Sequence, residues 1–305
     1  MYICGMMWRE MIVALGAVLM FWNVENYFDP FDDPLKNDDE FTALGERRWT
    51  WSRFEKKRDG LAQAIVAAGD VWGELPAIVG LAEGENRLVV SQLVRETMLD
   101  ELGYGYVHRE SPDVRGIDVA LLYRKDRLRV VAVDSLRVPD VVTRDVLYVV
   151  LGETPGQAGG DGLLHIFVVH LPSKRGGARA SDERRRAASA VLQNAVDSLL
   201  ATDPACRIVV MGDFNDPTPS VDGLLPPPFD GEPARPGTLR YHGRWERIDH
   251  FFLSPAVPGM MQIFASGFLL EPDAAYLGDK PRRTSIGPRY HGGLSDHLPI
   301  LLKMP

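Results

Sequence analysis

Polar and ionisable residues recur in this sequence at the points where runs of apolar residues stop. Asp213 and Asn215 follow the apolar residues of RIVVMG. In the same way, Asn23 follows VLMFW, Glu83 follows AIVGLA, and His170 ends HIFVVH. Loops that leave a rigid scaffold of strands are a common location for binding and catalytic groups. We therefore expect these side chains to gather in one place.

Two segments near the C-terminus show the same pattern. Asp249 lies in ERIDHFFL, and Asp296 and His297 come just before LPILL. Taken singly, each of these residues has a structural explanation, because Asp and Asn are common turn residues. Taken together, they would require several coincidences of the same kind, which favours a shared site.

The residue types in this set point to one chemistry. Carboxylate and amide oxygens suit hard cations such as Mg²⁺ or Mn²⁺. Two histidines without sulfur ligands suit acid–base work or the stabilisation of an oxyanion. Attack of water on a phosphate ester needs a metal that neutralises charge, a base for the water, and donors for the phosphoryl oxygens. The set therefore contains the groups that metal-assisted attack of water on a phosphate ester needs.

The elements that must position these residues are mostly strands. Apolar runs predict strands in AVLMFWNVEN, LPAIVGLAE, GIDVALLYR, LRVVAVDSLRV, RDVLYVVLG, LLHIFVVHL, RIVVMGDF and RIDHFFLS. Helical spacing predicts helices over residues 52–68, 87–103 and 181–201, the second closed by Gly103. Several strands are linked as hairpins, which argues against a single parallel sheet. Antiparallel or mixed sheets with helices packed on them are expected.

The composition is that of one globular domain. The chain has 305 residues, of which 45% are hydrophobic and 25% charged, and no linker-like segment divides it. We expect an N-terminal extension over residues 1–16 and a single domain over residues 17–305, acting as a monomer. The formal net charge of −8 argues against a strong, nonspecific nucleic-acid binder. Cys4 and Cys206 are too far apart in sequence for a zinc motif or a disulfide framework.

The N-terminal segment MIVALGAVLMFW is similar to the apolar core of a signal peptide. It is too short to span a bilayer as a helix, and no small-residue cleavage site follows it. The segment is instead interpreted as leading into a buried first strand, so no stable membrane span is expected. A cytoplasmic location is expected, and secretion or a periplasmic location is the alternative if the N-terminus acts as a signal.

The order and wording of the motifs resemble a known family. WNVENYFD, GLAE, RGIDVALLYR, VVHLPSKRGG, MGDFND, WERIDHFFLS and GGLSDHLPI together resemble the endonuclease/exonuclease/phosphatase superfamily, which has the deoxyribonuclease I-like fold. The resemblance runs from about Ala17 to Leu302. It implies an α/β fold class: a four-layer α/β/β/α sandwich of two mixed, largely antiparallel sheets, with the site at one edge of the sheets.

The resemblance also implies a role for each residue of the set. Glu83 corresponds to the primary metal ligand, with Asn23 and Asp296 as further metal-site residues. Asp213 corresponds to the aspartate that orients or deprotonates water, and Asn215 to the amide that holds a phosphoryl oxygen.

The remaining roles concern the histidines and the substrate. By resemblance, His170 contacts the scissile phosphate, and Asp249 orients His297, the second catalytic histidine. Substrate-binding candidates are the basic residues Arg115, Lys174 and Arg175, and Asp118 is a candidate partner of His170.

These observations lead to one hypothesis and one alternative. The hypothesis is a Mg²⁺- or Mn²⁺-dependent phosphoesterase that hydrolyses a phosphodiester or phosphomonoester by direct attack of water. The substrate would be a nucleic acid, a phospholipid head group or an inositol phosphate, and a nuclease is one form of the hypothesis. The alternative is a catalytically inactive module on the same fold that binds phosphate or nucleic acid.

Overall fold

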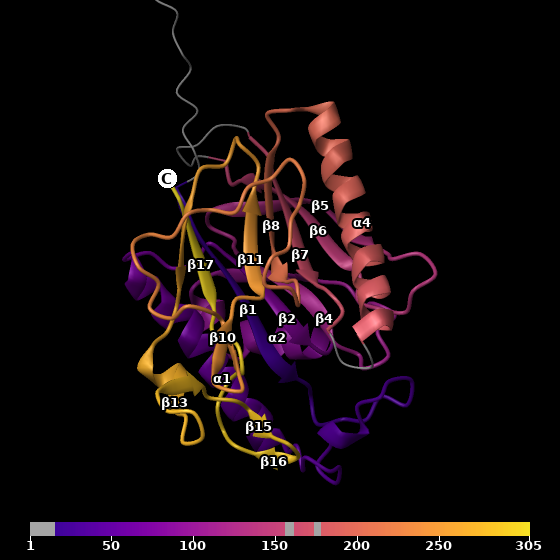
Figure 1. Cartoon of the computed structure of the whole chain (residues 1–305), viewed down its shortest axis with the longest axis vertical. Coiled ribbons are helices and arrows are strands. Elements are labelled where there is room, and N and C mark those ends of the chain that lie inside the picture. The colour runs from indigo at the N-terminus through magenta and orange to yellow at the C-terminus, as the bar shows by residue number, and fades with distance from the viewer. Residues whose placement is uncertain (1–15, 156–161, 174–177) are drawn as a thin grey trace, which may run out of the picture.

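Two large β-sheets form the centre of the molecule (Figure 1). The structure, a computed structural model, describes residues 16–155, 162–173 and 178–305. Residues 1–15 of the expected N-terminal extension therefore lie outside the described residues. The first sheet has the strand order β12-β17-β1-β2-β4-β3. Its strands are β1 (Ala17–Tyr27), β2 (Ile78–Gly84), β3 (Tyr104–His108), β4 (Asp118–Arg124), β12 (Met260–Ile263) and β17 (Ile300–Met304).

The second large sheet has the order β11-β8-β7-β6-β5. Its strands are β5 (Leu128–Leu136), β6 (Val146–Glu153), β7 (Leu164–His170), β8 (Arg207–Asp213) and β11 (Asp249–Leu253). Only the pairs β1–β2 and β7–β8 are parallel among the paired neighbours of these two sheets in the described chain. Both sheets are thus mixed and largely antiparallel, which confirms the expected sheet type.

Helices cover the outer faces of the two sheets (Figure 1). The helices are α1 (Trp51–Ala67), α2 (Arg87–Arg95), α3 (Met98–Glu101) and α4 (Ala178–Thr202). Three short ribbons complete the described strands: β9 (Leu239–Tyr241) with β10 (Arg244–Glu246), β13 (Leu270–Pro272) with β14 (Asp279–Pro281), and β15 (Ser285–Ile286) with β16 (Arg289–Tyr290). Within the described residues, no helix is both long and apolar enough to cross a membrane.

The alternation of side chains along β7 and β8 creates the layers. Successive residues of a strand point to opposite faces. One set of alternating residues packs in the core with the first sheet, namely Ile166, Val168, Val209 and Met211. The other set, Phe167, Val169, Ile208 and Val210, packs in a second core with Ala188, Leu192 and Val196 of α4. The four-layer order of helix, sheet, sheet and helix follows from this alternation, as expected.

The two sheets approach each other closely at Gly80. A Cβ atom on this residue of β2 would come within 2.5 Å of Met211 Sδ in β8. The missing side chain therefore lets Met211 fill the space between the sheets.

The expectation of one helix over residues 87–103 is wrong, because the structure has two. Helix α2 ends at Arg95 and α3 begins at Met98. Thr97 lies between them in an extended conformation, and its hydroxyl accepts a hydrogen bond from the Leu99 N–H (3.3 Å). A threonine hydroxyl offers the backbone this alternative to a continuous helix.

A buried lysine ties α1 to the end of β1. Lys57 is only 1% exposed, and its ammonium group donates to the Glu25 carbonyl and to Thr284 Oγ1 (2.6 Å). The Glu25 carboxylate in turn accepts from the Thr284 N–H (2.7 Å). Burial lowers the pKa of Lys57 to about 8, although the nearby Glu25 carboxylate opposes this shift. This network holds Glu25 in a left-handed conformation (φ 47°) two residues after Asn23.

Substituting Lys57 tests how much this network stabilises the fold. Lys57→Met should lower the free energy of unfolding by about 3 kcal/mol, because it removes the donor to the buried Glu25 carbonyl and the positive charge beside the buried Glu25 carboxylate. Lys56→Met is the matched control at an exposed neighbour and should change stability by less than about 0.5 kcal/mol. Urea denaturation followed by circular dichroism measures both. Equal stability of the two variants would contradict a stabilising role for the network.

Candidate active site

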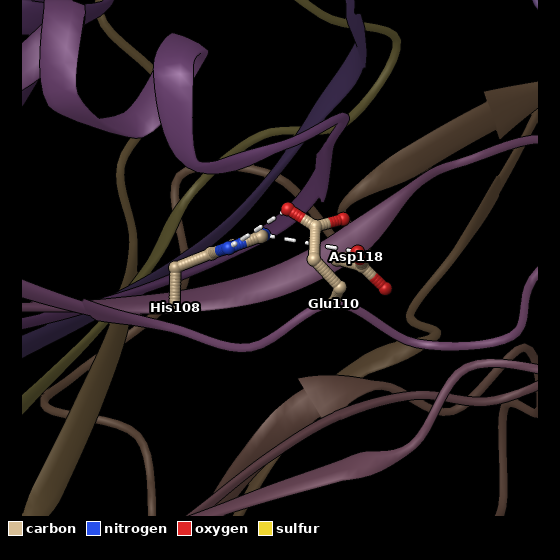
Figure 2. A group of neighbouring side chains, drawn as sticks. All are labelled: His108, Glu110 and Asp118. Atoms are coloured by element: carbon tan, nitrogen blue, oxygen red, sulfur yellow. Dashed lines mark ion pairs between the residues drawn. The ribbon is translucent and has the colours of Figure 1, made fainter. Parts of the chain in front are cut away.

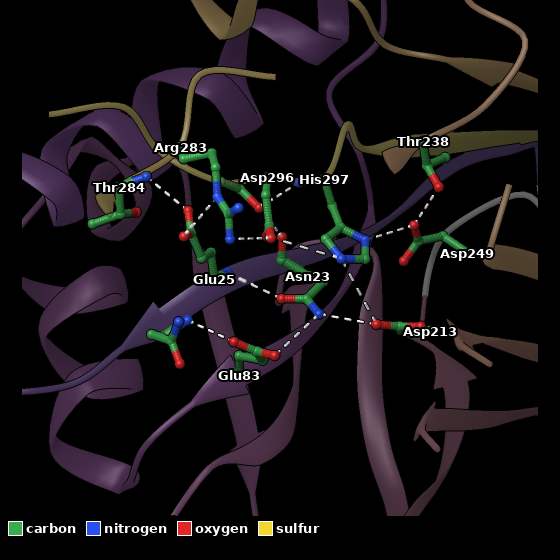
Figure 3. Close-up of polar contacts among 12 residues, drawn as sticks. Asn23, Glu25, Glu83, Asp213, Thr238, Asp249, Arg283, Thr284, Asp296 and His297 are labelled. Carbon is green, nitrogen blue, oxygen red and sulfur yellow. Dashed lines mark hydrogen bonds and ion pairs between the residues drawn. The ribbon is translucent and has the colours of Figure 1, made fainter. Parts of the chain in front are cut away.

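The topology brings the predicted residues to one edge of both sheets. Parallel strands end on the same side, so the ends of β1 and β2 meet in the first sheet and those of β7 and β8 in the second. The antiparallel strands β11 and β17 begin at this edge. In register, His170 lies opposite Asp213, and Asp213 lies opposite Asp249. Figure 3 shows how the side chains of Asn23, Glu83, Asp213, Asp249 and His297 gather at this edge.

Asp213 lies at the centre of the cluster and is 2% exposed. Its Oδ2 accepts a hydrogen bond from Asn23 Nδ2 (3.0 Å), and its Oδ1 accepts one from the Asn215 N–H (2.8 Å). His170 Nε2 lies 3.6 Å and His297 Nε2 3.9 Å from Asp213 Oδ2. Burial, and then the negative charge of Asp249, raise the pKa of Asp213 to about 7. A carboxylate of this kind can exchange a proton near neutral pH.

Glu83 is held as an anion beside Asp213. Its Oε2 accepts a hydrogen bond from the Asn26 N–H (2.8 Å), and its Oε1 lies 3.8 Å from His170 Nε2. Burial by itself raises the pKa of Glu83. The positive charge of Arg115, the contact with His170 and the Asn26 N–H outweigh burial and lower it. Glu83 adopts a left-handed conformation (φ 67°), which turns its side chain at the end of β2.

The imidazole of His170 is neutral at physiological pH. Burial and the adjacent Arg144 guanidinium lower its pKa well below the ordinary value. Its Nδ1 is buried without a hydrogen-bond partner in the described part of the chain. The expected candidate partner Asp118 instead lies beside His108, with Oδ2 3.7 Å from His108 Nε2. The Arg144 guanidinium supports the strand end by donating to the His170 carbonyl (2.9 Å).

His297 and Asp249 form a buried pair. His297 Nδ1 donates to Asp249 Oδ2 (2.8 Å), and the Thr238 hydroxyl donates to the same oxygen. Burial alone lowers the pKa of His297, but the carboxylates of Asp249, Asp213 and Asp296 together raise it well above the ordinary value. The imidazole is therefore positively charged, and its Nε2 faces Asp213.

The turn that carries His297 is fixed to β1 by hydrogen bonds. Ser295 Oγ donates to the Asn23 carbonyl (2.6 Å) and accepts from the His297 N–H (2.9 Å). Trp22 Nε1 donates to the His297 carbonyl (2.9 Å). The serine of the SDH motif thus positions the histidine, although it does not join the cluster itself.

Asp296 lies on the open side of the cluster. Its Oδ2 accepts a hydrogen bond from Arg283 Nη2 (2.8 Å), and Arg283 Nε lies 3.4 Å from Glu25 Oε1. Glu25, Thr238 and Arg283 were not among the predicted site residues. Glu25 alone had a signal in the sequence, because it belongs to the matched motif WNVENYFD.

Asn215 lies at the rim of the cluster, where it bends the chain after β8. Its Nδ2 donates to the Leu171 carbonyl (2.9 Å), which ties the loops after β7 and β8 together. It adopts a left-handed conformation (φ 51°), which asparagine tolerates better than most residues.

One of the predicted basic residues can be placed beside this cluster. The Arg115 guanidinium donates to the Asn26 side-chain oxygen, next to the backbone group that holds Glu83. Lys174 and Arg175 lie outside the described residues.

Two groups of side chains in the described chain have a composition that could hold a metal ion. One comprises Asp213, Asp249 and His297 of the cluster above. The other comprises His108, Glu110 and Asp118, in which the imidazole lies 3.7 Å from each carboxylate (Figure 2). In this second group, burial raises the pKa of Asp118 to about 8 and lowers that of His108 to about 4, so both side chains are neutral at neutral pH.

The donor set around Glu83 fits a hard divalent cation. Glu83 supplies a carboxylate that its neighbours keep anionic, and Asp296 supplies a second carboxylate at the open side. Asn23 turns its amide nitrogen toward Glu83 (3.5 Å), and its amide oxygen accepts from the Glu25 N–H (3.0 Å), so this amide would have to exchange that contact to bind the ion. Oxygen donors of this kind match Mg²⁺ or Mn²⁺ rather than a thiophilic metal.

Comparison with known proteins identifies the family. Residues 18–224 match the Endonuclease/Exonuclease/phosphatase family, and the chain belongs to it. Members of this superfamily are hydrolases that act on phosphoester bonds and depend on divalent metals. No curated protein sequence gives a match to the chain.

Solved structures share the fold at low sequence identity. Truncated TDP2 of Caenorhabditis elegans is 16% identical with a TM-score of 0.61, and the match covers 96% of this chain and 98% of that one. The mannosyl-6-phosphatase Bt3783 of Bacteroides thetaiotaomicron is 16% identical with a TM-score of 0.60, over 95% and 99% of the two chains. The catalytic domain of human Nocturnin is 17% identical with a TM-score of 0.55, over 95% and 94%. These likenesses confirm the deoxyribonuclease I-like sandwich.

The pairing of His297 with Asp249 predicts an unusual titration. In the metal-free protein, the imidazole of His297 should stay protonated at pH values where an ordinary histidine is neutral. Asp249→Asn should lower its pKa, because burial then dominates. NMR titration of the imidazole resonances measures this shift, with the exposed Asp222→Asn as a control. An unchanged His297 titration in Asp249→Asn would contradict the pairing.

The same shift fixes the direction of a pH effect on stability. A histidine with a raised pKa contributes stability that is fully present below its unfolded-state pKa and is lost as the pH rises through the folded-state pKa. The stability advantage of the wild type over Asp249→Asn should therefore be largest in acid, until other groups unfold the protein, and should decrease in alkali. Denaturation midpoints at several pH values check this trend.

Proposed function

We propose that this chain is a Mg²⁺- or Mn²⁺-dependent phosphoesterase that hydrolyses a phosphate ester by direct attack of water. The observation that carries the proposal is the arrangement around Asp213: a buried carboxylate with a pKa of about 7, with the neutral His170 on one side and the charged His297 on the other. Activation of water and stabilisation of a phosphoryl anion need these three types of group.

Each residue then has a defined task. Glu83, Asn23 and Asp296 would hold the ion, which when bound neutralises negative charge on the phosphoryl group. Asp213 orients the attacking water and accepts its proton. Asn215 lies at the same rim and would hold a phosphoryl oxygen.

The two histidines face the phosphoryl group with different charges. Neutral His170 contributes a hydrogen bond at Nε2 without adding charge, whereas His297 contributes a positive charge that Asp249 maintains. Preorganised donors of this kind stabilise the charge that develops in the transition state. No covalent intermediate with the enzyme is required, because water is the nucleophile.

The neighbours support an ester of phosphoric acid as the substrate. One is named a mannosyl-6-phosphatase, and Nocturnin holds a bound sulfate anion. A panel of plasmid DNA, RNA, bis-p-nitrophenyl phosphate, inositol phosphates and sphingomyelin, each with Mg²⁺ or Mn²⁺, tests the reaction and the substrate class. Hydrolysis of none of these, together with retained phosphate binding, would instead support a binding module without catalytic activity.

Substitution of Glu83 tests the metal site. Glu83→Gln should raise the Mg²⁺ concentration needed for half-maximal activity and lower activity at limiting Mg²⁺ by about 10–100-fold, because it removes a charged ligand. The fold should be retained. The exposed Glu96→Gln is the matched control, since it makes the same chemical change far from the cluster. Unchanged activity of Glu83→Gln at limiting Mg²⁺ would remove Glu83 from the metal site.

A double substitution tests whether Asp249 and His297 act as one unit. Asp249→Asn and His297→Ala should each reduce kcat strongly, by about 10²–10⁴-fold. If Asp249 acts only through the imidazole, the double variant should lose little more than either single variant. Steady-state kinetics of the three variants measures this. Losses that multiply would show that the two residues act independently.

A further inference from the structure

A cavity of about 250 Å³ lies beside the catalytic cluster. Asn26, whose N–H donates to Glu83, lines one side of it, and Pro172 and Ser173, which follow His170 closely in the chain, line another. Four guanidinium groups and two carboxylates also line it: Arg47, Arg115, Arg144, Arg184, Glu40 and Asp113. The cavity is smaller than the roughly 300–1,000 Å³ of pockets that take a whole ligand, so it fits a part of a substrate.

The lining brings several guanidinium groups together. Each of the two carboxylates already contacts an arginine: Glu40 lies 2.9 Å from Arg47, and Asp113 lies 3.0 Å from Arg144. The Arg115 guanidinium, by contrast, donates to the neutral side-chain amide of Asn26. Arg115, whose hydrogen bond within the lining goes to a neutral group, lies with Arg47 and Arg144 in this wall, and three guanidinium groups gathered in one wall attract an anion.

The cavity is connected rigidly to the reaction centre. Arg144 donates to the carbonyls of His170 (2.9 Å) and Leu171 (3.2 Å), so its guanidinium is fixed to the end of β7. Arg115 is held by the residue whose N–H positions Glu83. An anion in this cavity would therefore keep a constant position relative to the phosphate that is hydrolysed.

We infer that this arginine-lined cavity binds a second phosphate group of the substrate. This inference rests on the proposed function. Planar guanidinium groups bind phosphate oxygens in pairs, and they do so better than a point charge of the same sign. The chain therefore selects esters that carry another phosphate near the scissile one, either the next phosphate of a nucleic-acid strand or the second phosphate of a small bisphosphate.

Matched substrates test the inference. In the nucleotide arm, the p-nitrophenyl ester of thymidine 5′-phosphate is compared with the same ester carrying a 3′-phosphate. In the inositol arm, an inositol monophosphate is compared with an inositol bisphosphate. The second phosphate should raise kcat/KM by about tenfold or more, mainly through KM, because it adds a charge-assisted contact. A higher kcat/KM in the nucleotide arm alone would identify a nucleic-acid strand as the substrate. A higher kcat/KM in the inositol arm would identify a small bisphosphate as the substrate.

Variants identify the residues responsible. In Arg115→Gln and in Arg47→Gln, the ratio of kcat/KM between the doubly and the singly phosphorylated substrate should fall to near one. This holds whatever the effect of each change on the singly phosphorylated substrate. Arg129→Gln is the matched control, since Arg129 is exposed and its strand partner in β6, Gly152, lies at the opposite end of the sheet from His170. Equal kcat/KM for both members of both pairs, or an unchanged preference in both variants, would overturn the inference.

A binding measurement separates this inference from the proposed function. In Asp213→Asn, which should not turn over substrate, calorimetry compares thymidine 5′-phosphate with thymidine 3′,5′-bisphosphate, and inositol monophosphate with inositol bisphosphate. In at least one pair, the bisphosphate should bind about tenfold more tightly, and the additional Arg47→Gln change should remove the difference. If the bisphosphate binds more tightly but the wild type hydrolyses no substrate, the inference that the cavity binds phosphate would stand and the proposed reaction would not. Equal affinity for the two ligands of each pair would overturn the inference that the cavity binds a second phosphate.

Discussion

Burial of the Asp213 carboxylate is the constraint on which the rest of the site depends. A charged group at 2% exposure is costly unless donors and opposite charges surround it. Here Asn23 and the Asn215 N–H donate to it, and the charged His297 lies 3.9 Å away. Asp249 raises the pKa of both partners, which favours a proton on His297 and weakens the anionic form of Asp213. His297 is therefore positively charged, whereas His170 is neutral because it is buried beside the guanidinium of Arg144.

The backbone at this edge is shaped by the same requirement. Four residues that are not glycine adopt left-handed conformations here: Glu25, Asn26, Glu83 and Asn215. Such conformations cost free energy and persist only where the surroundings enforce them. The buried Lys57 holds the Glu25 carbonyl, and the N–H of the next residue, Asn26, holds Glu83. The fold thus stabilises a bent chain whose bends direct side chains from separate strands to one point.

Much of this arrangement could be predicted from the sequence, but not the hydrogen bonds and ion pairs that link its residues. Polar residues at the ends of apolar runs indicated the strand ends, and the order of the motifs indicated the fold. No such pattern marks Arg144, Thr238 and Arg283. These residues lie in loops, and contacts with residues distant in the sequence determine where the loops lie. The break between α2 and α3 was missed because the hydrophobic spacing continues through Thr97, whereas the hydroxyl of that residue forms a local cap. Asp118 lies in a matched motif, yet its side chain turns toward His108.

The net charge of −8 and the proposed recognition of an anion are compatible because the charges are unevenly distributed. Net charge governs long-range attraction, which salt screens beyond about 10 Å, whereas binding depends on the groups within contact distance. At the edge of the sheets, Arg115 and Arg144 lie close enough to His170 to lower its pKa, and Arg115 also lowers that of Glu83. These arginines therefore stabilise an anionic Glu83 and disfavour a second charge on His170. The positive wall that would receive a phosphate group is also part of what sets the protonation of the cluster around Asp213. Under the proposed function, substrate recognition and acid–base chemistry would therefore share the same guanidinium groups.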